Sequence, residues 1–348
     1  MMNLRARSGL LLLFFCSGAA GLGYQMVWLR MFAAGLGHET PAVLAVAGAF
    51  LGGMAVGAWF LDRRISRSAH PARWYGGLEL AIGGWGALTV LLIPIVNLLA
   101  LRLTGASPSP LQQWLIVFVL PFLTLLPATA AMGATLPAMD RFLAPFTEDG
   151  RCVGALYAAN TFGAVAGVLG SVFVLMPVLG FRLTLISLAA LNLCCGIIAL
   201  RFNKLAAADV RSLSGKKSSE ARRLEPHPGS HAGSISFWRI RLTVFFTGLL
   251  GFGFELAGRR GLAEVLENTV YTFAAVLSVY LMGTAAGAAL YQRSVSRRAF
   301  ERASSFLLCG VTTACFLGTG LMGFPSAVYR HARGWCGDSI PGVLAAEM

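Results

Sequence analysis

Few side chains of this 348-residue sequence could do chemistry, and the most unusual of them stand inside long apolar runs. Gln25 and Arg30 lie in one such run, Glu79 in another, and Glu255 and Arg260 in a third. A charged side chain at the centre of a membrane span costs about 2.5–3.5 kcal/mol on insertion scales, so it usually faces a partner or a water-filled cavity. These five positions are therefore candidates for the lining of a solute path.

Each of these candidates also has a structural interpretation. Arg30 and Arg260 stand near the outer ends of their runs, where a guanidinium group can extend to water. Residues five apart on a helix are rotated by about 140° beyond a full turn, so Gln25 is not expected to contact Arg30 directly. Glu255 is expected to pair with a residue on another helix. Glu79 could cap the start of its helix, pair with a loop arginine or line a cavity.

Tyr157 and Asn160 form a further polar pair in an apolar run that is rich in glycine. Because they are three residues apart, they share one face of a helix. They could contribute to a polar central cavity, and the alternative for Asn160 is a hydrogen bond between helices.

The sequence offers no arrangement typical of an enzyme. It has no Ser/His/Asp combination, no paired carboxylates and no CxxC pair among its seven cysteines. The run Gly251-Phe252-Gly253-Phe254-Glu255 is glycine-rich, but no strand precedes it, and close packing of helices explains such glycines better than a phosphate loop does. The sequence therefore predicts no catalytic residue, no metal site and no cofactor.

The composition identifies the elements that must hold these side chains. Hydrophobic residues make up 56% of the chain and charged residues only 12%, against about 25% charged residues in ordinary globular domains. The mean hydropathy is +0.70. A water-soluble body of this size could not cover its surface with so few charges, so most of the chain is expected to meet the lipid bilayer.

The formal net charge of +13 does not indicate nucleic-acid binding. The basic residues fall in short clusters between apolar runs, without the interleaved aromatic residues of a nucleic-acid surface. Of the 28 Lys and Arg residues, 21 lie in the N-terminus and in alternate connections, at residues 62–73, 140–151, 201–241 and 292–302. By the positive-inside rule these segments are cytoplasmic. We expect a multi-pass protein of the cell's inner (plasma) membrane with a cytoplasmic N-terminus.

Nine apolar segments are long enough to be membrane spans, and lipid requires that they be helices. The first resembles a signal peptide at its start, but its apolar stretch continues to about residue 34, so an uncleaved span is expected. The predicted fold is an all-α polytopic helix bundle. Its segments are residues 10–34, 42–61, 74–100, 112–139, 152–177, 183–200, 240–262, 270–291 and 304–324.

An internal repeat divides the chain. A shift of about 230 residues aligns the first span with the seventh and the second with the eighth, so that Gly53 meets Gly283 and Gly57 meets Gly287. The organisation is that of major-facilitator transporters, with two bundles joined by a linker. We predict a six-helix bundle over residues 1–200, a basic cytoplasmic linker over 201–238, and a second bundle over 239–348. The second bundle is expected to be incomplete, with three spans and the start of a tenth, as in a truncated chain.

Three motifs resemble a known family. SGAAGLGYQMVWLR at residues 17–30, GATLP at 133–137 and GALYAANTFGA at 154–164 are similar to segments of fused major-facilitator/spermidine-synthase membrane proteins. The resemblance covers residues 10–200 and, more loosely, 240–348. It implies a membrane domain that in typical members is followed by a cytosolic aminopropyltransferase-like domain, which is not found in this sequence. Asp62-Arg63-Arg64 resembles the major-facilitator loop that locks helices in one access state; the alternative is a basic loop that only sets orientation.

Two functions from different classes remain open at this point. The first is a transporter-like module for a small cationic solute, which the acidic positions and the polyamine chemistry of the resembled family favour. The second is a membrane anchor or scaffold for an aminopropyltransferase-like domain, with no transport of its own. Enzymatic activity of these 348 residues by themselves is not expected.

Overall fold

The computed structural model of the chain describes residues 4–36, 39–105, 109–143, 152–214, 237–262, 270–294 and 300–321, with a few positions between 323 and 334. All regular elements in these ranges are helical, as the apolar segments predict. In chain order they are α1 (Leu4–Leu36), α2 (Glu39–Ser66), α3 (Pro71–Thr104), α4 (Pro110–Leu143), α5 (Cys152–Gly170), the π-helical turn η2 (Ser171–Leu175), α6 (Met176–Ser214), α7 (Phe237–Leu262), α8 (Val270–Ser294) and α9 (Phe300–Leu321).

Six of the described helical stretches are long and apolar enough to cross a membrane. A helix needs about 20 residues to span about 30 Å of hydrocarbon. The chain thus has the helices of a multi-pass membrane protein. Helices α7 and α9 coincide with the predicted segments 240–262 and 304–324 but are not among the six, so the count of nine spans stays a prediction. The six stretches are Ser8–Leu36, Ala42–Ser66, Pro71–Thr104, Pro110–Leu143, Gly154–Phe202 and Phe273–Leu290.

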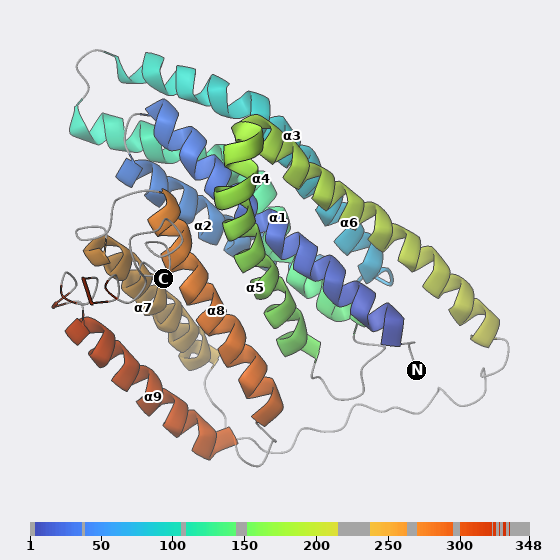
Figure 1. Cartoon of the computed structure of the whole chain (residues 1–348). Helices are drawn as coiled ribbons and strands as arrows, with labels where there is room; N and C mark the ends of the chain where they lie inside the picture. Colours follow the sequence, from blue (N-terminus) through green and yellow to red (C-terminus); the bar gives the residue numbers. More distant parts are fainter. Residues whose placement is uncertain are drawn as a thin grey trace. The chain divides into compact units, whose positions relative to one another are not determined.

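The stretch Gly154–Phe202 is too long to be one span. Its 49 residues would extend over about 70 Å as a straight helix, more than twice the hydrocarbon thickness. It bends at Gly180, whose φ of 70° and ψ of 174° lie in a region that only glycine enters at low cost. The bend lies near the start of α6 and separates α5, η2 and the first residues of α6 from the rest of α6, in agreement with the predicted segments 152–177 and 183–200 (Figure 1).

Glycine contacts show which helices pair and in which direction. A methyl group at Gly163 or Gly167 of α5 would lie 1.9 Å from a backbone oxygen of α1, of Phe15 and Ala19 respectively. Since these contacts advance together along both helices, α5 runs parallel to α1. In the same way Gly48, Gly52 and Gly57 of α2 meet α4 in increasing order, at Phe118, Phe122 and Ala130.

Helices α3 and α6 are paired in the opposite sense. Gly76 of α3 faces Leu200 of α6, whereas Gly83, farther along α3, faces the earlier residue Leu193. The order is reversed, so the two helices are antiparallel. Helix α3 itself runs parallel to α1, because the hydrogen bonds that join the two helices advance along both. Helices α1, α3 and α5 therefore run one way and α6 runs back, as alternate crossings of a membrane require.

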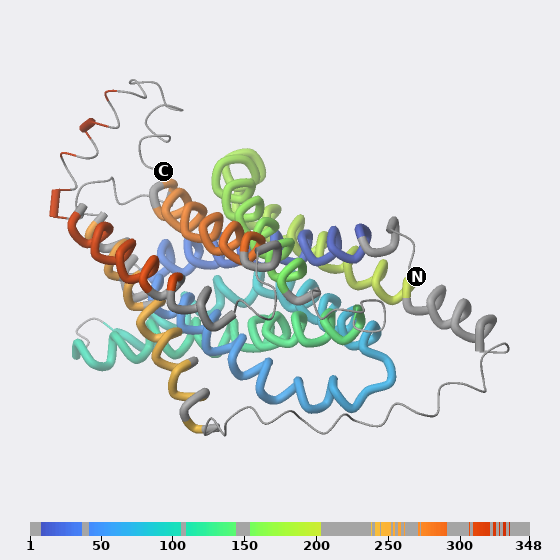
Figure 2. Tube along the Cα trace, turned by 90° about the horizontal axis from the view of Figure 1, so that it is seen from below, coloured from blue at the N-terminus to red at the C-terminus, as the bar shows by residue number. Residues whose placement is uncertain are grey.

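The described helices belong to two compact units, which we treat separately. One contains Met1–Lys204 and Leu277–Phe300, and the other contains Leu205–Val276 and Glu301–Met348. In the first unit α1 contributes several of the largest fully buried side chains, Tyr24, Trp28 and Phe32 among them, and α2 to α5 pack on it (Figure 2). Helix α6 continues to Ser214, so the predicted linker 201–238 is helical at its start, and residues 215–236 lie outside the described residues.

Candidate functional site

The carboxylate of Glu79 is completely buried where α1, α3 and α6 meet. The Ser17 hydroxyl of α1 donates a hydrogen bond to one carboxylate oxygen at 2.5 Å. The Asn192 amide of α6 donates to the other oxygen. Both partners are buried as well, with 9% and 1% of their surfaces exposed. A single side chain of α3 thus joins three helices through polar contacts.

Small residues make this arrangement possible. Gly76 and Gly83 stand one turn before and one turn after Glu79 on α3, and each lies against α6. A methyl group at Gly196 of α6 would in turn lie 2.9 Å from the backbone oxygen of Gly76. Because the two backbones approach so closely, the short side chain of Asn192 can reach the carboxylate.

Further polar groups surround the carboxylate. Tyr75 lies one turn before Glu79 on α3, and its buried hydroxyl interacts with the carboxylate without the geometry of a hydrogen bond. The Oδ1 atom of Asn192 is also buried and has no hydrogen-bond partner among the described residues. Within those residues no basic side chain forms an ion pair with Glu79. The cluster of Ser17, Tyr75, Glu79 and Asn192 is called the Glu79 cluster below.

Of the three interpretations that the sequence leaves open for Glu79, helix capping and a loop-arginine pair do not describe its hydrogen bonds, and the lining of a cavity stays a prediction. The residue before α3 is His70, which makes no side-chain capping bond, and Glu79 lies two turns into the helix. Its partners are neutral side chains on other helices and not a loop arginine. The structural role that it does play is to join helices.

The other predicted path residues of the first unit do not join the Glu79 cluster. Gln25 and Arg30 are half-buried on α1. On α5, Tyr157 is 43% exposed and Asn160 is half-buried, with its backbone oxygen against Gly18 of α1. None of these four residues donates a hydrogen bond to the Glu79 carboxylate in the described structure. A common path through them stays a prediction.

Glu255 and Arg260 belong to α7, in the other unit. Their side chains lie outside the described residues. The predicted role of Glu255 as a cavity residue therefore stays a prediction, as does its expected pairing with another helix.

Asp62, the first residue of the motif Asp62-Arg63-Arg64, forms an ion pair that was not predicted from the sequence. The Asp62 carboxylate of α2 accepts a hydrogen bond from the Arg141 guanidinium of α4 at 2.9 Å, and the same guanidinium donates to the Asp62 backbone oxygen at 3.3 Å. The two side chains are 50% and 31% exposed. Arg63 and Arg64 themselves are exposed. The contact joins the ends of α2 and α4.

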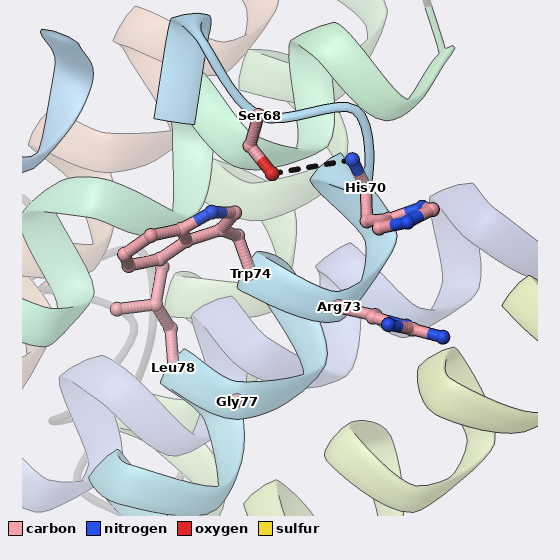
Figure 3. Close-up of a pocket in the computed structure, with 6 residues that line it drawn as sticks. All are labelled: Ser68, His70, Arg73, Trp74, Gly77 and Leu78. Carbon is pink, nitrogen blue, oxygen red and sulfur yellow. Dashed lines mark hydrogen bonds between the residues drawn. The ribbon is translucent and has the colours of Figure 1, made fainter. Parts of the chain in front are cut away.

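A shallow groove lies beside the start of α3 (Figure 3). It has a volume of about 380 Å³ and is open to the outside. Its lining comes from the turn after α2 and from the first two turns of α3, and consists of Ser68, His70, Arg73, Trp74, Gly77 and Leu78. The Ser68 hydroxyl accepts a hydrogen bond from the His70 backbone N–H at 3.2 Å. Glu79 does not line the groove.

Ser17, Tyr75 and Asn192 are site residues that were not predicted from the sequence. Asn192 could have been identified from the sequence as a candidate site residue, because it is an amide between Leu191 and Leu193 in a run that is otherwise apolar. Ser17 gave little indication of its role in the sequence, since small hydroxyl residues are common where helices pack closely.

In the described residues no group of three His, Cys, Asp or Glu side chains could hold a metal ion. Comparison of the chain with known protein families, curated proteins and solved structures finds no match.

Proposed function

We propose that this chain is a transporter-like membrane module with the helix arrangement of a major-facilitator half-bundle, and that it handles a small cationic, polyamine-like solute. The proposal rests on the pairing of helices α1 to α6. The module resembles the membrane part of fused major-facilitator/spermidine-synthase proteins through the motifs at residues 17–30, 133–137 and 154–164.

The pairing supports a nested repeat of three helices. If α1, α2 and α3 are exchanged with α4, α5 and α6, the α1–α5 pair becomes the α2–α4 pair, and the α3–α6 pair maps onto itself. The exchange also relates the α3–α4 contact, in which Trp85 Nε1 donates to the Thr124 backbone oxygen, to the α1–α6 contact of Cys195 with Leu13. Since three crossings reverse the direction of the chain, the two triplets have inverted topology. Inverted triplets within each six-helix half are typical of major-facilitator transporters.

The charge of the candidate residues favours a cationic solute. The acidic residues within predicted spans are Glu79 and Glu255, and an intramembrane carboxylate is by default a candidate for an ion or substrate pathway. Glu79 is enclosed in the described packing. Glu255 is therefore the first candidate for a carboxylate that meets the solute.

A binding experiment tests this function. The purified chain in detergent or nanodiscs would be titrated with radiolabelled spermidine, with an uncharged solute of similar length as the reference. We expect saturable spermidine binding that weakens about tenfold or more in Glu255→Gln, equivalent to about 1.4 kcal/mol. Glu220→Gln and Glu225→Gln, in the predicted linker, serve as controls and should bind as the wild type does. Absence of spermidine binding to a folded wild-type chain would reject the transport function and leave the anchor function.

The cytoplasmic placement of the N-terminus and of residues 201–238 belongs to the same proposal, because the positive-inside rule supports both. Ser218→Cys would be treated in intact cells with a thiol reagent that does not cross membranes. The cysteine should react only after the cells are opened. Labelling in intact cells would reverse the orientation.

A further inference from the structure

We propose that Glu79 is a proton-binding site: in the packed bundle its carboxyl group carries a proton, and it can release that proton only when α1 or α6 moves away from α3. The proposal concerns the state of one buried carboxyl group and does not need transport to occur. If the chain transports a solute as proposed above, the proton is the ion that can be coupled to it.

The charge balance around the carboxyl group favours the protonated form. Among the described residues, the titratable groups that face it are Tyr75 on α3 itself, Cys16 and Tyr24 on α1, and Cys195 on α6. Each of these groups is neutral or negative, so none supplies a positive charge. A buried carboxylate without a cation keeps only the dipoles of its hydrogen-bond donors, and these do not replace the hydration that an ion loses. Neutralisation by a proton removes this cost.

The packing around the carboxyl group leaves no room for a larger cation. Both carboxylate oxygens are already in direct contact with the side chains of Ser17 and Asn192. The Asn192 amide presents its N–H hydrogens, which would repel a metal ion or an ammonium group placed at the same oxygen. Glycine contacts at Gly76 and Gly83 hold α6 against α3 on both sides of the site. A proton needs no additional volume, so it fits this packing and a sodium ion or an amine does not.

The neutral acid satisfies the observed contacts. A protonated carboxyl group can donate its O–H to the Ser17 hydroxyl at the observed 2.5 Å, because a hydroxyl oxygen both donates and accepts. The Asn192 amide continues to donate to the other oxygen. The buried Oδ1 of Asn192 has no donor within the part of the chain that the structure describes, so the cluster has unused acceptor capacity there. An added proton can be accommodated without moving a side chain.

Release of the proton requires water at the carboxyl group. Glu79 lies eight residues after Pro71, about 12 Å along α3 from its start. Its hydrogen-bond partners stand on two different helices. Separation of either helix from α3 would break one hydrogen bond and admit water, which stabilises the ionised form. Protonation is thereby linked to the packing of α1, α3 and α6.

Infrared difference spectroscopy of the purified full chain in nanodiscs tests the proposal. At about pH 5.5 an exposed glutamate, with an ordinary pKa of about 4.3, is more than nine-tenths ionised, so a carboxylic-acid C=O band reports a buried acid. We expect the wild type to show such a band, shifted in D₂O, and Glu79→Gln to lose it. Asp62→Asn, which changes a half-exposed carboxylate, should retain the band. A wild-type spectrum without an acid band, or a band that Glu79→Gln leaves intact, would overturn the proposal.

A second variant covers the case in which Glu79→Gln does not fold. Asn192→Leu removes one hydrogen bond to the carbonyl oxygen, so the acid band should move to higher wavenumber. An unmoved band would mean that it belongs to another acid. Spectra in sodium and in choline chloride, and with added spermidine, test the other cations. Loss of the band on addition of sodium or spermidine would show that a larger cation occupies the site. An acid band in a chain that binds no spermidine would reject the transport function and keep this inference.

Discussion

The two copies of the internal repeat have similar glycine patterns and different surroundings. In α1 and α2 the glycines are packed: a methyl group at Gly57 would lie 1.7 Å from the Ala130 backbone oxygen, and one at Gly53 would lie 1.8 Å from the Thr129 hydroxyl oxygen. In α7 and α8 no described atom lies within 4 Å of the corresponding methyl positions, at Gly253, Gly283 and Gly287.

The difference comes from the partner helices and not from the repeat itself. In the first copy α4 and α5 cover the glycine faces of α2 and α1. In the second copy α9 is the last helix assigned among the described residues. A row of glycines on one helix face stabilises the packing of the bundle only when another helix backbone lies against it. Close van der Waals contact stabilises membrane helices, and an uncovered glycine makes no such contact.

Polar positions differ between the copies in the same way. Ser17 donates to Glu79 on another helix, whereas its counterpart Thr247 donates to Thr243 in its own helix. Trp28 donates to Thr89 on α3 at 2.9 Å, while the second copy has Gly258 at the corresponding position. In the first copy, these residues of the repeat therefore make hydrogen bonds between helices.

The largest loss of stability is expected at Trp28, the residue that most distinguishes the two copies. Trp28 is fully buried, stacks on Tyr24 at a ring separation of 5.0 Å and donates to Thr89. Trp28→Ala should cost about 3–5 kcal/mol of stability, because it leaves a large cavity. Thermal unfolding in detergent measures the loss. Trp59→Ala, at a tryptophan that is 80% exposed, is the control and should change stability by less than about 0.5 kcal/mol.

The next largest change in stability is expected at Gly57, which is compared with its counterpart Gly287 in the second copy. Gly57→Ala should destabilise by about 1–3 kcal/mol, since the new methyl group forces α2 away from the α4 backbone. Gly287→Ala should be neutral or stabilise by up to about 1 kcal/mol, because alanine favours the helix and the site is open. Both variants would be unfolded thermally under the same conditions. Equal losses at the two positions would show that the second copy is packed like the first.

A smaller change in stability is expected at Ser17, which is compared with its counterpart Thr247 in the second copy. Ser17→Ala removes one hydrogen bond to Glu79 and should cost about 1 kcal/mol or somewhat more. Thr247→Val removes a hydrogen bond to the backbone of its own helix at an exposed position, and should change stability by less than about 0.5 kcal/mol. Unfolding midpoints of the two single variants provide the test. If Ser17→Ala is as mild as Thr247→Val, the Glu79 cluster does not stabilise the bundle.

The smallest effect is expected at the ion pair of α2 and α4. Asp62→Gln gives the first copy the residue that the second copy has at Gln292, and removes the partner of Arg141. Because both side chains are partly exposed, the loss should not exceed about 1 kcal/mol and should shrink at high salt. A double-mutant cycle with Arg141→Gln measures the coupling between the two residues. A coupling far above this value would indicate a lock stronger than a surface ion pair.

The sequence predicted those features that depend on one helix alone, such as the helices themselves and the unusual position of Glu79. Apolar runs with few charges predict helices in lipid, and every predicted segment overlaps a described helix. Glu79 was identifiable because a carboxylate in such a run is costly wherever the helix packs. Its partners were not identifiable, because Ser17 and Asn192 are 62 and 113 residues away along the chain. Arg141 was missed for the same reason, being 79 residues from Asp62.

The sequence by itself determined that the chain is helical, apolar and repeated, since hydropathy and the spacing of glycines are properties of each segment. Only the tertiary structure decided which glycine stripes are covered, where the chain reverses within residues 154–202, and that a serine and an asparagine rather than an arginine face the buried carboxyl group. The physical reason is that helix formation satisfies backbone hydrogen bonds within one segment, whereas contacts between helices depend on how two surfaces, distant in sequence, fit together.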